Sequence, residues 1–257
     1  MLFYFTATGN SLYAAKQFDE ERYSLAREMG KDHRRYEADA IGIVCPLYEF
    51  DLPEVVKEFI RGSEFVTDYF YIVITYGAHD GAVARRVETF LTSIGKKADY
   101  INTVIMLDNA LLVFDMDEQR KLDPGKKVDE HLAAIAEDIK ARKHYIQPAA
   151  KEESEFSEGY LAHREKYEAS NENPLYTVLD NCVGCGICSK VCPMGCIEIQ
   201  DGRPSYDYTH CAGCMACIQA CPQKAIRFRS RKEVNPGARY RNPNITLAEL
   251  IAANTRK

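Results

Sequence analysis

The sequence predicts an α/β protein with a doubly wound parallel sheet, followed by a small second module that binds metal. Over about the first 145 residues, apolar segments that read as buried strands alternate with amphipathic segments that read as helices. Nine of the ten cysteines then fall between Cys182 and Cys221. A chain of 257 residues with 46% hydrophobic content is long enough for one sizeable core and one small module.

Five apolar segments are the predicted strands of the sheet. In chain order they read LFYF, RYSL, AIGIVCP, YFYIVITYG and NTVIML. The predicted helices run from Ser11 to Glu21, Pro53 to Gly62, Gly81 to Ile94 and Lys126 to Lys143. Because strands joined by helices pair in parallel, we expect a five-stranded sheet with helices on both faces.

Changes in composition set the expected domain boundaries. They are an α/β domain over residues 1–146, a charged linker over 147–174, the cysteine module over 175–230 and a basic tail over 231–257. The favoured interpretation of the linker is a solvated, partly helical connection, and a lid that packs on one domain is the alternative. After Cys221 the chain has nine Lys and Arg against two Glu. A solvated face is favoured there, with docking on an acidic surface of the chain as the alternative.

The cysteines form two copies of the spacing C-x2-C-x2-C-x3-C-P. The first copy is Cys182, Cys185, Cys188 and Cys192, and the second is Cys211, Cys214, Cys217 and Cys221. Three cysteines at two-residue gaps in a tight loop can turn their sulfurs toward one centre, where thiolates bind iron. Zinc is disfavoured because its sites commonly use two C-x-x-C pairs, and disulfides are disfavoured because this is a metal-ligand spacing.

This stretch resembles bacterial-type ferredoxins with two [4Fe-4S] clusters, over about residues 176–228 and including the endings CPMGCIEI and CPQKAIRF. In that family the fourth cysteine of each repeat ligates the other cluster. The resemblance therefore implies one cluster held by Cys182, Cys185, Cys188 and Cys221, and a second held by Cys211, Cys214, Cys217 and Cys192.

Three further features of the cysteine module can be interpreted from the sequence. Cys196 stands where the ferredoxin family usually has alanine, and we interpret both it and Cys45 as small buried core residues. The glycines Gly184, Gly186 and Gly213 fit loops in which the backbone approaches a cluster closely. Between the repeats, QDGRPSYDY predicts a hairpin with its turn at Asp201 and Gly202.

The opening stretch LFYFTATGNS is an apolar strand that breaks into a loop of hydroxyl-bearing and small residues. Its candidate phosphate-binding residues are Thr6, Ala7, Thr8, Gly9, Asn10 and Ser11. Hydroxyls, an amide and backbone N–H groups can donate to a phosphate, although Ser and Thr at a helix start are also ordinary caps. The loop resembles the flavodoxin phosphate loop, Thr-x-Thr-Gly-Asn-Thr, with Ser11 keeping the last hydroxyl. This resemblance covers about 145 residues and implies FMN as a cofactor.

Flavodoxin-like proteins place the FMN ring between two further loops at the carboxyl ends of neighbouring strands. The candidates here are Pro46, Leu47 and Tyr48 in one loop, and Thr75, Tyr76, Gly77 and Gly81 in the other. His79 and Asp80 lie near the expected ring, but a solvated loop explains them as well.

The whole chain resembles the flavodoxin–ferredoxin fusion proteins of anaerobic microbes. That resemblance implies low-potential electron transfer between two [4Fe-4S] clusters and one FMN, with a redox protein as donor or acceptor. The alternatives are a flavin-dependent reductase of a small oxidised substrate and a redox docking or sensor protein without flavin. Whether the chain is an enzyme is therefore left open.

Several classes of function find no support in the sequence. Outside the cysteine repeats there is no G-x-G-x-x-G after a strand and no P-loop lysine motif, so a nicotinamide site is unsupported. A net charge of -5 with mixed signs disfavours a nucleic-acid partner. Since no apolar run reaches the ~20 residues of a membrane span, we expect a cytoplasmic protein.

Overall fold

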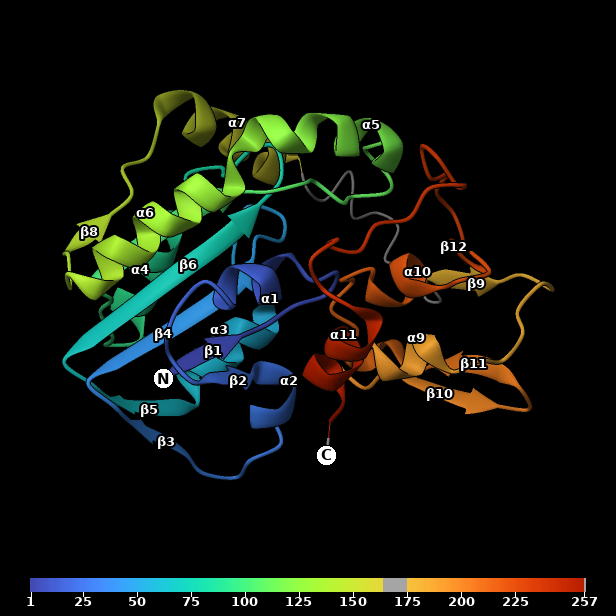
Figure 1. Ribbon diagram of the computed structural model, residues 1–257, viewed down its shortest axis with the longest axis horizontal. Coiled ribbons are helices and arrows are strands. Elements are labelled where there is room, and N and C mark those ends of the chain that lie inside the picture. Colours follow the sequence, from blue (N-terminus) through green and yellow to red (C-terminus); the bar gives the residue numbers. More distant parts are fainter. Residues whose placement is uncertain (164–174, 257) are drawn as a thin grey trace.

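The computed structural model describes residues 1–163 and 175–256, which form a large α/β domain and a smaller lobe (Figure 1). The central sheet has the order β2-β1-β4-β6-β7-β8, and all of its strand pairs are parallel. Its strands are β1 (Leu2–Tyr4), β2 (Arg22–Ser24), β4 (Ala40–Pro46), β6 (Tyr69–Tyr76), β7 (Tyr100–Ile105) and β8 (Tyr145–Ile146). The first five in this order form the doubly wound sheet of the flavodoxin-like fold, so the predicted fold class is confirmed.

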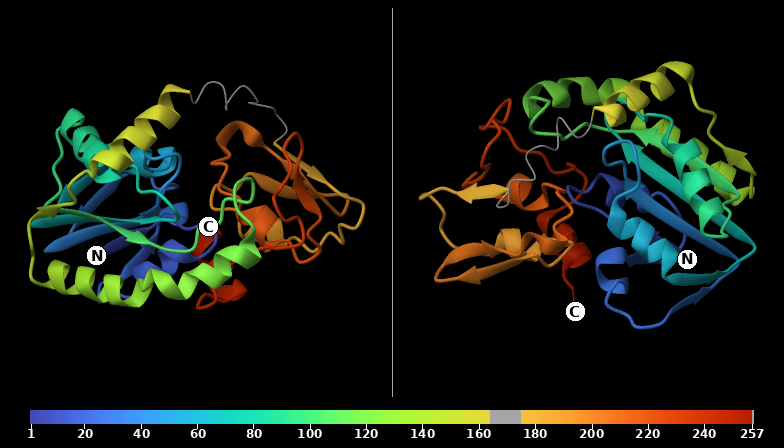
Figure 2. Two further views of the ribbon diagram at one scale, coloured as in Figure 1. Left: turned by 90° about the horizontal axis from the view of Figure 1, so that it is seen from above. Right: turned by 180° about the vertical axis from the view of Figure 1, so that it is seen from behind.

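Helices cover both faces of this sheet (Figure 2). The helices α1 (Asn10–Ala15) and α6 (Val128–Lys140) bury side chains in one hydrophobic core, and α3 (Glu54–Arg61) and α4 (Val83–Ser93) bury theirs in another. Successive residues of β1 alternate between the cores, with Leu2 in the first and Phe3 in the second. This alternation follows from the two-residue period of a strand that is buried on both sides.

Some elements of the α/β domain were not predicted. They are β3 (Arg34–Glu37), β5 (Ser63–Val66), α2 (Leu25–Glu28), α5 (Met116–Leu122) and the 3-10 helix η1 (Asp123–Lys126). The strands β3 and β5 pair in parallel beside the main sheet. Their short sequences RRYE and SEFV show little alternation of apolar and polar residues, which explains why the pattern did not reveal them. The sixth strand of the main sheet, β8, has only two residues.

The C-terminal lobe is built from two small antiparallel sheets and short helices. Its elements are β9 (Tyr176–Val178), α9 (Ile187–Lys190), β10 (Ile197–Gln200), β11 (Arg203–Tyr206), η2 (Tyr208–His210), α10 (Ala216–Ala220) and β12 (Ile226–Phe228). The strands β9 and β12 pair with each other, and β10 and β11 form the predicted hairpin. At its turn, Asp201 and Gly202 both have positive φ, as a two-residue type I′ turn requires.

Helix α7 (Lys151–Ala162), inside the expected linker, packs on the α/β domain (Figure 2). The Phe156 ring stacks on His79 with ring centroids 4.1 Å apart, and Ser157 Oγ donates to the Gly81 carbonyl oxygen at 2.9 Å. For this helix, the lid alternative describes the contacts better than a solvated connection. The remainder of the expected linker includes residues 164–174, which lie outside the described residues.

The basic tail is not the solvated face that its charge favoured. Tyr240, Asn242 and Ile245 are all buried, and helix α11 (Leu247–Asn254) contacts both α2 of the α/β domain and α9 of the lobe (Figure 1). The tail docks mainly through aromatic, amide and aliphatic side chains. Docking of basic residues on an acidic surface, the alternative prediction, is therefore not the main contact. One exposed ion pair, Lys16 to Glu249 at 2.7 Å, adds to this contact.

Candidate metal centres and the predicted flavin loops

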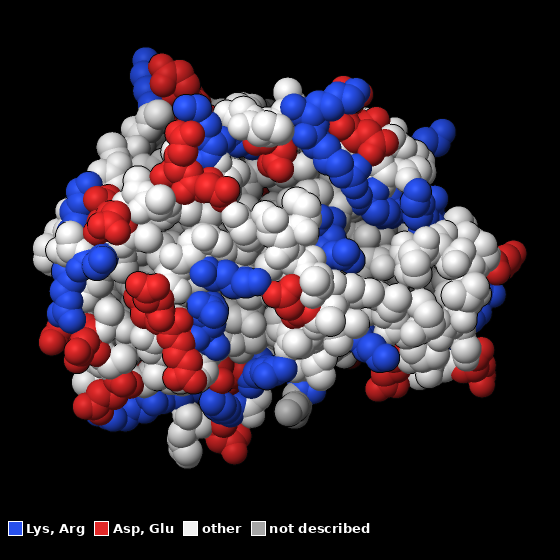
Figure 3. Space-filling view, viewed as in Figure 1, with Lys and Arg blue, Asp and Glu red and all other residues white. Residues whose placement is uncertain are grey.

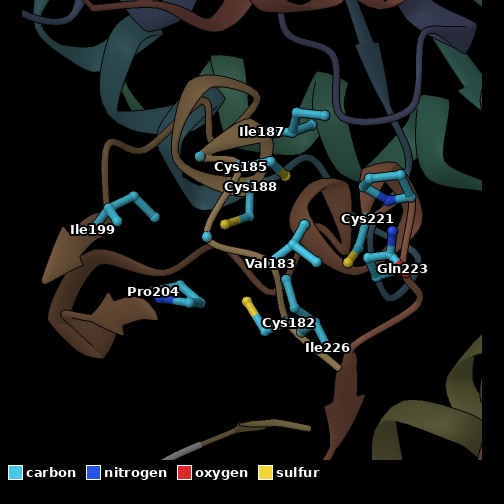
Figure 4. A pocket seen from close by; sticks show the side chains of 13 residues that line it. Cys182, Val183, Cys185, Ile187, Cys188, Ile199, Pro204, Cys221, Gln223 and Ile226 are labelled. Atoms are coloured by element: carbon cyan, nitrogen blue, oxygen red, sulfur yellow. The ribbon is translucent and has the colours of Figure 1, made fainter. Parts of the chain in front are cut away.

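Four thiols surround one pocket of the lobe (Figure 4). They belong to Cys182, Cys185, Cys188 and Cys221, and aliphatic side chains line the rest of the space. The space measures about 360 Å³, part of it open to solvent. These are the four cysteines that the ferredoxin resemblance groups together, including the one contributed by the second repeat.

A second pocket of about 320 Å³ lies on the other side of the lobe, toward the α/β domain. Its thiols belong to Cys192, Cys211, Cys214 and Cys217, again with the fourth cysteine taken from the other repeat. Cys196 is a fifth thiol in this lining, and it is buried. The backbone therefore brings together both of the sets that the resemblance implies.

Local backbone geometry explains how the loops aim their thiols. Gly184 has a φ of +65°, and a Cβ at this residue would lie 2.5 Å from the carbonyl oxygen of Gly202. The hairpin turn thus packs directly on the first cysteine loop, and only glycine fits. Backbone N–H groups point at the fourth sulfur of each repeat, from Cys196 to Cys192 Sγ at 3.4 Å and from Ala225 to Cys221 Sγ at 3.3 Å.

The chemistry of both sets fits iron–sulfur clusters. Burial raises the pKa of Cys188 to about 11 and raises those of Cys214 and Cys217 as well. Such thiols become thiolates only when a cation binds them. In the described part of the chain, no three His, Cys, Asp or Glu side chains converge on a point as ligands of a single ion do. The thiols instead surround a space, which is the arrangement that a cluster of several irons and sulfides needs.

The second set faces the α/β domain across a packed interface. Cys214 packs against the core that contains Leu12, while Met194 and Ala212 pack against the other core together with Tyr48. Burial raises the pKa of Tyr48, and the nearby thiols of Cys214, Cys45 and Cys211 raise it further. Tyr48 thus packs against the same core as Met194 and Ala212, which line the second pocket.

The three predicted flavin loops do meet at the carboxyl ends of β1, β4 and β6. Ser11 Oγ and Thr75 Oγ1 are hydrogen-bonded at 2.8 Å, and the Leu47 N–H donates to the Thr75 carbonyl oxygen at 2.8 Å. Ala7 and Gly81 are buried, whereas Pro46, Tyr76 and Gly77 are half-buried.

Side chains of this chain fill the surroundings of the loop after β6. The Asp108 carboxylate lies directly against Gly77, and Lys126 Nζ donates to the Gly77 carbonyl oxygen at 2.8 Å. His79 pairs with Glu153 of α7 at 3.0 Å, and Asp80 accepts a hydrogen bond from Gln147 at 2.7 Å.

The predicted phosphate loop is covered by a segment that we term the C-terminal strap, residues 238–246. Asn10 Oδ1 accepts hydrogen bonds from the Tyr240 hydroxyl at 2.7 Å and from Asn242 Nδ2 at 3.1 Å. The Asn242 backbone N–H donates to the Thr8 carbonyl oxygen at 2.9 Å. A Cβ on Gly9 would lie 3.1 Å from the Cβ atoms of both Asn242 and Ile245, so the strap lies directly on the loop.

The hydroxyls of this loop are also partnered within the chain. Thr6 Oγ1 accepts from the Gly9 N–H at 3.2 Å, and Thr8 Oγ1 accepts from Asn109 Nδ2 at 2.8 Å. Thr6, Thr8 and Ser11 are only 1%, 4% and 2% exposed. In this arrangement the chain itself covers the groups that would contact a phosphate, so the loop does not fit the phosphate of FMN.

Gln219 links the cysteine lobe to this covered loop, and sequence reasoning missed it together with the strap. Gln219 Nε2 donates to the Asn109 carbonyl oxygen at 2.8 Å, and Gln219 Oε1 accepts from the Tyr240 N–H at 2.8 Å. Gln219 follows Cys217 on α10, so one buried network joins the second cysteine set, the strap and the loop. No local pattern marks such a residue, because its partners lie 110 and 21 residues away in the chain.

Comparisons with known proteins identify the cysteine module. Residues 181–225 match the family model of the 4Fe-4S dicluster domain. No curated protein matches the chain. Among solved structures, a putative flavoprotein from Bacteroides uniformis is 15% identical, with 47% of this chain and 94% of that chain covered and a TM-score of 0.29. The Trp repressor binding protein from Bacillus subtilis is 13% identical, with 53% of this chain and 97% of that chain covered and a TM-score of 0.29.

On the face shown in Figure 3, Lys and Arg are interspersed with Asp and Glu over the α/β domain, while the lobe at the right carries few charges. Across the described residues, none of the helices has the length and apolar character needed to cross a membrane.

Proposed function

We propose that this protein is an electron carrier built on two [4Fe-4S] clusters, one in each set of four thiols, that serves redox protein partners. The observation that carries the proposal is the grouping of eight cysteines around two spaces, with the fourth thiol of each repeat exchanged. When bound, such clusters supply one-electron transfer at low potential. The thiols would hold the irons, and the Cys196 and Ala225 N–H groups would stabilise the sulfurs beside them.

The two sets have different surroundings, which supports different roles for them. Cys185 is exposed and its neighbour Val183 is 63% exposed, so a partner protein can approach the first set from solvent. Cys192 and Cys217 of the second set are buried, and this set faces the α/β domain. We therefore propose that electrons enter and leave at the first set.

The role of the α/β domain depends on whether it holds a flavin. The flavodoxin resemblance implies FMN, but the strap covers the phosphate loop, so we derive no step through a flavin. The covered loop favours a second candidate function, a redox docking protein whose α/β domain binds and shields the second cluster. A flavin-carrying form, including a flavin-dependent reductase, would require the strap to leave the loop.

Cofactor content after anaerobic purification tests this proposal. We expect about eight irons and about eight sulfides per chain, because each cluster contains four of each. Cys185→Ser should halve the iron content, while the control Cys45→Ala, in the α/β core, should leave it unchanged. One iron or one zinc per chain, or equal iron in both variants, would contradict the proposal. Acid release of one FMN per chain would reject the flavin-free candidate alone.

A further inference from the structure

Three buried tyrosine hydroxyls have no hydrogen-bond partner within the described residues, and two of these tyrosines line the pocket of the second cysteine set. The three hydroxyls belong to Tyr48, Tyr176 and Tyr206. Elsewhere among the described residues, the unpartnered buried side-chain atoms belong to Ser63 and Arg239. Because a buried hydroxyl without a partner costs free energy, these three hydroxyls need an explanation.

The three tyrosines come from both the lobe and the α/β domain. Tyr176 on β9 and Tyr206 on β11 line the pocket of the second set, with ring centroids 5.8 Å apart. Tyr48, in the α/β domain, packs against the same core as Met194 and Ala212, which also line this pocket. Burial raises the pKa of Tyr176, and the thiols of Cys217, Cys214 and Cys211 raise it further. Burial likewise raises the pKa of Tyr206, and the thiol of Cys217 raises it further.

The first cysteine set has no comparable surroundings. Besides the thiols, its pocket is lined by Val183, Ile187, Ile199, Pro204 and Ile226, with backbone and Gln223 (Figure 4). No hydroxyl-bearing side chain is among the described residues of this lining. The two clusters would therefore have different hydrogen-bond donors although their ligands are alike.

We propose that the hydroxyls of Tyr48, Tyr176 and Tyr206 donate hydrogen bonds to the sulfurs of the second cluster and raise its reduction potential above that of the first. The inference rests on the proposed function, since it needs both clusters. Reduction adds negative charge to the sulfurs, so O–H donors stabilise the reduced form more than the oxidised form. Solvent near Cys185 also raises the reduction potential of the first cluster. In this proposal the three O–H donors raise the potential of the second cluster by more.

This difference in reduction potential determines which cluster holds a single electron. When the chain holds one electron, it resides mainly on the second cluster, next to the α/β domain. Exchange between the clusters oxidises one and reduces the other by the same electron, and no proton or covalent bond moves. Because Tyr48 comes from the α/β domain, docking of that domain supplies one of the three donors.

The test is a redox titration of the full holoprotein, monitored by electron paramagnetic resonance, in Tyr48→Phe, Tyr176→Phe and Tyr206→Phe. Phenylalanine keeps the ring and removes only the donor. The matched control is Tyr208→Phe, because its ring stacks on Tyr206 at 5.3 Å while its hydroxyl already bonds the Tyr176 backbone. Loss of one set of signals in Cys211→Ser assigns the second cluster.

Each of the three variants should lower the reduced-to-oxidised ratio of the second cluster at a fixed potential by up to about tenfold, which is about 59 mV for a one-electron couple. The first cluster and the Tyr208→Phe control should not change. Both clusters present with unchanged potentials would overturn the inference and leave the proposed function standing. Wild-type protein without about eight irons would overturn the function itself.

A measurement on the wild-type protein tests the inference even if the variants lose iron. The Fe–S stretching bands in resonance Raman spectra should shift between H2O and D2O for the second cluster, because its O–H donors exchange. Bands of the second cluster that do not shift between the two solvents would overturn the inference.

Discussion

The Tyr240 hydroxyl donates a 2.7 Å hydrogen bond to Oδ1 of Asn10, which lies 230 residues earlier in the chain. Asn10 belongs to the loop that resembles a flavodoxin phosphate loop, and Tyr240 belongs to the C-terminal strap. Asn242 adds a second hydrogen bond to the same oxygen at 3.1 Å. The strap therefore closes the loop while helix α11 holds the lobe against the α/β domain.

Removing these two strap contacts should open the loop to FMN. A Tyr240→Phe, Asn242→Ala double variant loses both hydrogen bonds to Asn10, and we expect it to bind FMN at least about tenfold more tightly than the wild type. Quenching of flavin fluorescence in a titration measures the affinity. Asn244→Ala, an exposed position in the same strap, is the control. Equal affinities in all three proteins would show that the strap does not control access.

The exchange of the fourth cysteine between the sets gives a sharper prediction than iron counting alone. Cys192 follows the three cysteines of the first repeat but lines the second pocket. Cys192→Ser should therefore remove or alter the second cluster and leave the first cluster intact. Electron paramagnetic resonance of the reduced protein should then match that of Cys211→Ser. A match to Cys185→Ser instead would contradict the exchange.

Cys196 tests whether every thiol in the second pocket is needed. It is buried, and its N–H donates to Cys192 Sγ at 3.4 Å, a bond that does not use the Cys196 side chain. We expect Cys196→Ala to retain about eight irons, with a loss of roughly 1 kcal/mol in stability because one buried atom is removed. Iron analysis and thermal unfolding measure both quantities. Loss of four irons would identify Cys196 as a ligand.

Two glycines at equivalent positions of the repeats should respond differently to alanine. Gly184 and Gly213 have φ of +65° and +60°, so both substitutions carry the cost of a left-handed residue, roughly 1–2 kcal/mol. The Gly184 Cβ would also lie 2.5 Å from the Gly202 carbonyl oxygen, whereas nothing lies within 4 Å of the Gly213 Cβ. Gly184→Ala should lose more iron and unfold at a lower temperature than Gly213→Ala. The reverse order would contradict the packing of the hairpin turn.

Removal of iron should unfold the lobe and spare the α/β domain. The core of the lobe includes Cys188, Cys192 and Cys217, so much of its packing depends on the proposed cluster ligands. The α/β domain has two cores, one on either side of the sheet, that consist mostly of its own side chains. Hydrogen exchange after chelation should lose protection in residues 175–230 and keep it in β4 and β6. Protection retained in the lobe would show that it folds without metal.

The sequence could predict what depends on local periodicity and spacing. The buried strands of AIGIVCP and YFYIVITYG, the helices after them and the hairpin turn at Asp201 and Gly202 all follow from such patterns. The grouping of the cysteines followed from the ferredoxin resemblance. The strap, by contrast, depends on contacts of Tyr240 and Asn242 with Asn10. The basic residues of the tail instead predicted a solvated segment. The packing of α7 depends on Phe156 meeting His79, and no pattern within either segment encodes such a contact.

The most direct test of the central claim is a coulometric titration of the anaerobically purified protein, with spins counted by electron paramagnetic resonance. Two one-electron clusters and a covered flavin loop predict about two electrons per chain and about two spins of the reduced iron–sulfur type. Uptake of about four electrons with a flavin radical signal would contradict the covered loop. Uptake of no electrons would contradict electron transfer as the function.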